Sequence, residues 1–158
     1  MSEKREAPWL EIAAGELGIK EIMGLKHQPR ILEYHKATSL KASEDETPWC
    51  SAFVNWVMLQ HGVKGTDSAL ARSWLAWGVP LDKPYKGCVI ILRRGTQPWQ
   101  GHVGFYLSEE FGVYRVLGGN QGNAVSIKSY NVSDLLGFRG PVTPGDKLFV
   151  EKGVENIC

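Results

Sequence analysis

The stretch Thr47-Pro-Trp-Cys-Ser-Ala-Phe-Val-Asn-Trp56 opens the strongest helical pattern in the chain and places a cysteine close to its start. Thr47 is a favoured N-cap residue and Gly62 a favoured stop, so the sequence predicts a helix over 47–61. Cys50 then lies in the first turn. Free backbone N–H groups and the positive end of the helix dipole favour a thiolate there.

A second stretch, Gly101-His-Val-Gly-Phe-Tyr106, predicts a strand in which His102, Gly104 and Tyr106 share one face. A cysteine at a helix start that faces a histidine on a sheet lets the imidazole act as base for the thiol. A third polar group would then hold the other ring nitrogen. We expect Asn120 in that place, because its loop follows the next strand along the chain.

Each of these residues also has a purely structural explanation. An inward-facing cysteine is common in protein cores, and an asparagine in a glycine-rich loop is common in turns. The joint occurrence of a capped helix start, a histidine on a strand and a polar loop residue, in this order, favours a catalytic interpretation.

The hydrophobic period changes near Pro80. Before it, helical spacing predicts three further helices, at Pro8–Leu17, at Pro29–Lys36 and from Asp67 or Ser68 to Gly78. After it, β-like runs predict strands at Cys88–Leu92, His102–Leu107, Val113–Leu117, Ala124–Ile127 and Lys147–Val150. The pattern predicts an α+β fold in which an N-terminal helical layer packs on a C-terminal antiparallel sheet. The 158 residues fit one catalytic domain, with a core of about residues 8–140 and a short C-terminal tail.

Composition excludes several classes of protein. Eighteen Lys and Arg against 17 Asp and Glu give a net charge of +1, so no nucleic-acid partner is expected. No apolar run approaches the ~20 residues of a membrane span, and the N-terminus lacks the apolar core of a signal peptide. We therefore expect no membrane partner and synthesis in the cytoplasm. The three cysteines include no CxxC pair, and the histidines form no HExxH motif. We therefore expect neither a bound metal nor a cofactor.

On the motifs around Cys50 and His102 the chain resembles the CHAP and NlpC-like cysteine peptidases and amidases that cut peptidoglycan, in particular small phage or prophage-type members. The likeness covers roughly Pro8 to Gly140 and implies a papain-like fold with the nucleophile at Cys50 and the base at His102. CHAP enzymes commonly carry a Glu and an Asn after the histidine. Asn120 takes the asparagine position, whereas Gly118 stands where the acid would be. Gln121 or a backbone carbonyl is the substitute.

The resemblance implies a monomeric peptidoglycan hydrolase that cuts an amide of the cell-wall peptide, or the amide that joins peptide to sugar. Holin-mediated release as an endolysin, or delivery by a secretion system as an antibacterial effector, would bring it to the wall. An effector would have an immunity protein as a partner. We expect Trp49, Trp99 and Gln121 to contact the substrate, since tryptophan offers a flat apolar face and a hydrogen-bond donor.

Two other functions remain open at this point. The missing acid is compatible with a catalytically inactive wall-binding or structural module of the same fold. A cysteine protease or deamidase that acts on other amides would carry the same Cys-before-His order. The sequence does not distinguish an endopeptidase from an N-acetylmuramoyl-L-alanine amidase.

Overall fold

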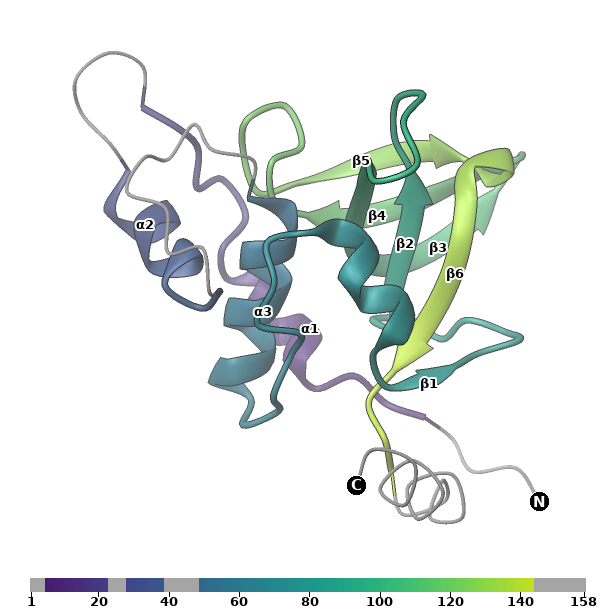
Figure 1. Cartoon of the computed structure of the whole chain (residues 1–158), viewed down its shortest axis with the longest axis horizontal. Helices are drawn as coiled ribbons and strands as arrows, with labels where there is room; N and C mark the ends of the chain where they lie inside the picture. The colour runs from purple at the N-terminus through teal and green to yellow at the C-terminus, as the bar shows by residue number, and fades with distance from the viewer. Residues whose placement is uncertain (1–4, 23–27, 39–48, 144–158) are drawn as a thin grey trace.

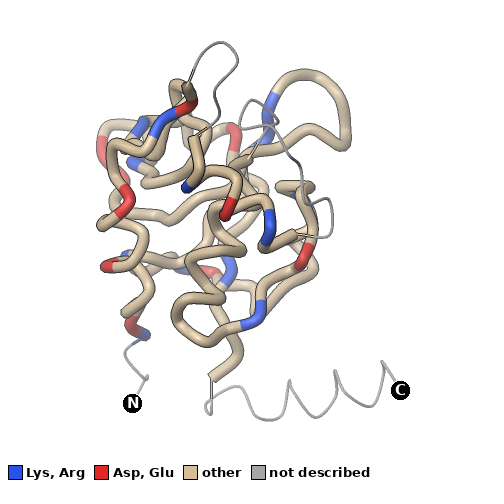
Figure 2. Tube along the Cα trace, turned by 90° about the vertical axis from the view of Figure 1, so that its left-hand side faces the viewer, with Lys and Arg blue, Asp and Glu red and all other residues tan. Residues whose placement is uncertain are grey.

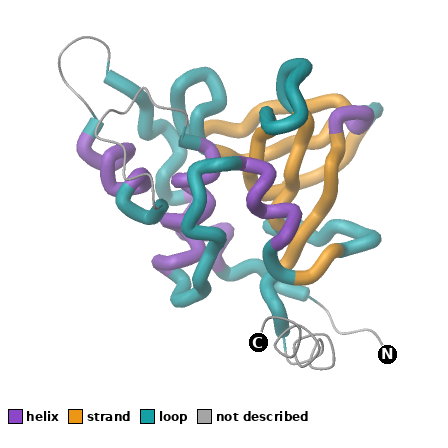
Figure 3. Tube along the Cα trace, viewed as in Figure 1, coloured by secondary structure: helices purple, strands orange, loops and turns teal. Residues whose placement is uncertain are grey.

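The computed structural model describes residues 5–22, 28–38 and 49–143, in which the three α-helices gather on one side of a six-stranded sheet (Figures 1 and 3). The helical elements are α1 (Trp9–Ala14), α2 (Pro29–His35), α3 (Cys50–Gln60) and the 3₁₀ turns η1 (Ala71–Ala76) and η2 (Val132–Asp134). The strands are β1 (Val79–Pro80), β2 (Val89–Arg93), β3 (Gly101–Glu110), β4 (Val113–Gly118), β5 (Ser126–Asn131) and β6 (Leu135–Gly140). No helix in the described part of the chain is both long enough and apolar enough to cross a membrane.

The sheet has the order β1-β6-β2-β3-β4-β5, and all its neighbouring strands are antiparallel. This confirms the expected α+β, papain-like arrangement, in which the helix that carries Cys50 packs on an antiparallel sheet. The β3–β4 ladder starts at the pair Phe105–Leu117, so β3 extends past the end of β4 over residues 101–104. The start of β3, where His102 lies, therefore has no strand partner on its β4 side.

Most of the predicted elements are present, with the following differences. The helix expected over 47–61 begins at Cys50 with Trp49 as its N-cap, and Thr47 lies outside the described residues. The fourth expected helix is a 3₁₀ turn, and the strand expected at Ala124–Ile127 starts at Ser126. Strands β1 and β6 were not predicted, and the strand expected at Lys147–Val150 lies outside the described residues.

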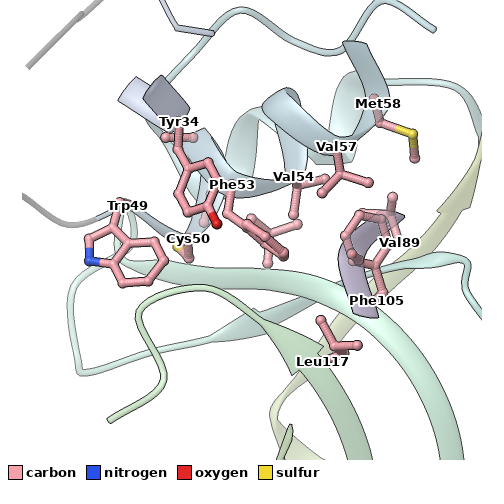
Figure 4. Close-up of a cluster of buried hydrophobic side chains, with 14 of the residues drawn as sticks. Tyr34, Trp49, Cys50, Phe53, Val54, Val57, Met58, Val89, Phe105 and Leu117 are labelled. Carbon is pink, nitrogen blue, oxygen red and sulfur yellow. The ribbon is translucent and has the colours of Figure 1, made fainter. Parts of the chain in front are cut away.

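The main core lies between α3 and the sheet (Figure 4). Phe53 on α3 meets Tyr34 of α2 edge-on at 5.1 Å and Phe105 of β3 at 6.2 Å between ring centroids. Val103 and Phe105 point to this core, so by alternation along β3 His102 lies on its other face. A smaller cluster that includes Cys88 and Phe138 covers that face. The buried side chains fix the helix start against the first residues of β3.

Trp49 belongs to this core and not to a substrate groove, which corrects the sequence-based expectation. Its side chain is fully buried, its ring stacks on Tyr34 at 5.8 Å, and its indole N–H donates to Glu21 at 2.8 Å. A ring without exposed surface cannot contact a ligand in this structure. Its role is to pack the chain immediately before the helix that carries Cys50.

Replacing Trp49 with alanine should lower the free energy of unfolding by about 3–5 kcal/mol, because a large buried ring leaves a cavity behind. Urea unfolding followed by circular dichroism measures this difference. Trp99→Ala is the matched control: that ring is 63% exposed, so a change within about 0.5 kcal/mol is expected. Equal losses for the two variants would contradict the structural role given to Trp49.

Candidate active site

Cys50 is the first residue of α3 and is 5% exposed. The backbone N–H groups of Val103, Ser51 and Cys50 itself face the sulfur. The residue lines a pocket of about 340 Å³ together with Leu70, Arg94 and Trp99. The thiol thus lies between the helix start and the residue that follows His102, with access to a hollow on the surface.

His102 is the second residue of β3 and is buried. Its ring stacks on Tyr130 of β5 with 5.1 Å between centroids, and its Nε2 lies 2.8 Å from Oε1 of Gln121. It lines a second pocket of about 250 Å³. Arg94 lines both pockets, so the thiol and the imidazole open on neighbouring hollows that share one wall.

The amide of Gln121 is held in one orientation. Its Nε2 donates to the carbonyls of Val116 at 3.1 Å and Ser126 at 2.7 Å, which uses both of its N–H groups. Oε1 must therefore be the atom that faces His102, and it also accepts from the Tyr130 hydroxyl at 3.1 Å. An oxygen acceptor at 2.8 Å requires a proton on Nε2 of His102. In the neutral ring, Nδ1 is then unprotonated and able to accept a proton.

Gln121, which the sequence offers as a substitute, and not Asn120, therefore lies at the ring nitrogen of His102. Asn120 has a positive φ of 58° and lines the pocket beside His102, whereas the next residue turns inward to the ring nitrogen. A Cβ at Gly118 would lie 2.7 Å from Oε1 of Gln121 and 3.4 Å from Nε2 of His102. The glutamine side chain thus occupies the space that an acidic side chain at position 118 would need.

The segment that carries these residues also matches a known family. The family model described as the CHAP domain matches residues 42–120, which is half of the chain and includes both Cys50 and His102. The chain belongs to the CHAP domain family. This family is of the peptidoglycan-hydrolase type, and its members are generally amidases or peptidases. The match ends one residue before Gln121, the residue bound to the imidazole.

One solved structure that resembles this CHAP domain is that of a Staphylococcus aureus Mu50 protein described as similar to lipoprotein, of the NLP/P60 family. The two are 16% identical with a TM-score of 0.48, and the alignment covers 85% of this chain and 40% of that chain. This chain thus corresponds to less than half the length of that protein. None of the curated proteins compared with the chain matches it.

Burial governs the ionisation of both groups in the CHAP site. Desolvation raises the pKa of the Cys50 thiol, while the Val103 N–H and the positive charge of Arg94 act in the opposite direction. Desolvation lowers the pKa of His102 to about 4, and the hydrogen bond that its Nε2–H donates to Gln121 acts in the opposite direction. The thiol and the imidazole are therefore both neutral near pH 7. The thiolate expected from the helix start alone is outweighed by burial.

The sequence did not identify three residues that surround the pair. Arg94 follows β2, and Lys128 and Tyr130 lie on β5. Their signal was present but weak: Lys128 and Tyr130 alternate on one face of a strand, directly after the loop that holds Gln121. Trp99 is exposed and lines the pocket of Cys50. Over the described ranges, no group of His, Cys, Asp and Glu could hold a metal ion.

The low pKa of His102 predicts a pH-dependent stability. The unfolded chain takes up a proton near 6.5 and the folded chain only near 4, so the contribution of His102 is complete above about pH 6.5 and is lost as the pH falls toward 4. Between pH 7 and 5 the loss should be about 2 kcal/mol. Urea unfolding at both pH values measures it. His102→Gln has no imidazole to titrate at this position, so between pH 7 and 5 its free energy of unfolding should fall by about 2 kcal/mol less than that of the unchanged protein. Equal losses in the two proteins would contradict a low pKa for His102.

Proposed function

We propose that this CHAP domain hydrolyses an amide bond of the peptidoglycan peptide by a Cys50–His102 thiol mechanism. The observation that carries the proposal is the fixed Gln121 amide, which holds a proton on Nε2 of His102 and leaves Nδ1 as the base. The exposed hollow at Cys50 gives an amide carbonyl access to the sulfur.

The reaction follows from the neutral resting pair. As the sulfur attacks the carbonyl carbon, the thiol proton moves to Nδ1 of His102, and Gln121 stabilises the imidazolium that forms. The backbone N–H of Cys50, at a helix start without an intrahelical partner, can donate to the oxyanion. His102 then gives its proton to the leaving amine. Water hydrolyses the thioester, with the same imidazole as base, and restores the thiol.

The test is the release of soluble fragments from purified sacculi, followed by mass analysis. New amine and carboxyl ends on stem peptides would identify an endopeptidase, and free glycan chains an amidase. In either case the protein would act at the cell wall, reached by holin-mediated release as an endolysin or by secretion as an effector. Intact sacculi after prolonged incubation would favour an inactive wall-binding module.

A further inference from the structure

The pocket at His102 is strongly basic. Basic and acidic residues are otherwise interspersed along the described trace (Figure 2). Among the described residues, neither Asp nor Glu lines this hollow of about 250 Å³. Three cationic residues and two amides surround the imidazole: Arg93, Arg94, Lys128, Asn120 and Asn123.

Two of these cations lack a carboxylate partner within the described ranges. Arg93 lies 3.7 Å from Asp134 and donates to the Ser133 carbonyl, so its charge is partly compensated. No described Asp or Glu lies within ion-pair distance of Arg94 or Lys128. Lys128 instead lies over the Tyr130 ring at 5.5 Å. Cations that have no carboxylate partner among the described residues, beside amide donors, suit an anionic group, and a carboxylate accepts from both.

The two pockets, which share Arg94, differ in the polarity of their lining. The Cys50 pocket carries two exposed apolar side chains, Leu70 at 60% and Trp99 at 63% exposure. The His102 pocket is basic. Because His102 must protonate the leaving amine, the amine side of the scissile bond lies toward His102. The acyl side then lies toward Leu70 and Trp99.

We propose that the pocket formed by Arg94 and Lys128 binds a carboxylate carried by the leaving-amine part of the substrate, while the acyl part lies against Leu70 and Trp99. The inference rests on the proposed function, which determines that the amine side of the scissile bond lies toward His102 and the acyl side toward Cys50. It narrows the substrate to amides whose amine side bears a free carboxylate close to the scissile nitrogen.

Binding to the Cys50→Ala protein tests the pocket without turnover. The probes are a stem tetrapeptide with free carboxylates and the same peptide with every carboxylate amidated, compared by calorimetry at low salt. The free form should bind at least about tenfold more tightly, and added salt should reduce this preference. Lys128→Gln and Arg94→Gln should each remove most of it. Lys83→Gln, an equal change of charge in the exposed loop before β2, should leave it unchanged.

Three results would overturn the inference: equal affinity for the two peptides, no binding of either, or a preference that survives both substitutions. The direction along the substrate is tested in the sacculus digest, where the fragment with the new amine must carry a carboxylate on that residue or the next. Hydrolysis without a carboxylate preference would support the proposed function and contradict the carboxylate pocket. Carboxylate-selective binding without hydrolysis would support the pocket and contradict the proposed function.

Discussion

Cys50→Ala should lower the release of soluble peptidoglycan fragments by at least about 10³-fold, because removal of a nucleophile leaves only binding and oxyanion stabilisation. The substitution removes one sulfur at the first residue of α3 and leaves the aromatic core around Tyr34 and Phe53 in place. We therefore expect a folded protein with an unchanged circular dichroism spectrum. Turbidity loss of purified sacculi, with mass analysis of the fragments, measures the effect.

Cys88→Ala is the matched control for this experiment. Cys88 is also a buried thiol, and burial raises its pKa to about 12, but it packs in the smaller core cluster and lines neither the Cys50 pocket nor the His102 pocket. Its loss should leave hydrolysis unchanged. Lysis retained by Cys50→Ala, or lost equally in both variants, would show that Cys50 is not the nucleophile.

The same two cysteines show what local sequence can and cannot predict about reactivity. Position at a helix start correctly identified Cys50 as the residue that faces the start of β3. It did not predict the ionisation state, because the pKa also depends on burial by segments far away in the chain.

The secondary structure was predictable where the hydrophobic periodicity of the sequence was strong. The strands from β2 to β4 and the three α-helices follow from apolar spacing and from glycine or proline at their ends. Strand β6 was missed because Leu135–Gly140 contains two glycines and reads as a loop, yet it pairs with β2 in the sheet interior. That pairing joins segments more than 40 residues apart, which no local pattern reports.

Two site residues show the same limit. Trp49 and Trp99 have equal intrinsic chemistry, but one is buried between helices and the other is exposed. Asn120 and Gln121 are neighbours, and which of them reaches His102 depends on the loop backbone. With φ at 58° for Asn120, the chain turns so that Gln121 points to the ring. The sequence placed Asn120 at the third position and offered Gln121 as a substitute, and the backbone of the loop decides between them.

Gln121→Ala should lower kcat/KM by about 10²-fold, since the imidazole loses the acceptor that fixes its tautomer and stabilises its charged form. A purely structural role of Gln121 would predict a similar loss, so a second variant must distinguish that role from action through the imidazole. A substitution at position 118 provides this variant. Gly118 has no positive φ, and a Cβ there would lie 3.4 Å from Nε2 of His102. An aspartate at this position can thus present a carboxylate to the same nitrogen.

Gly118→Asp alone should be harmful, because its Cβ would lie only 2.7 Å from Oε1 of Gln121. Combined with Gln121→Ala, which vacates that space, it should restore kcat/KM at least about tenfold relative to Gln121→Ala. The double variant would then be more active than either single variant, a non-additivity expected of groups that compete for one partner. The carboxylate should also raise the pKa of His102 and move the acidic limb of the pH–rate profile upward. Additive losses with an unmoved acidic limb would mean that Gln121 supports the loop and does not act through the imidazole.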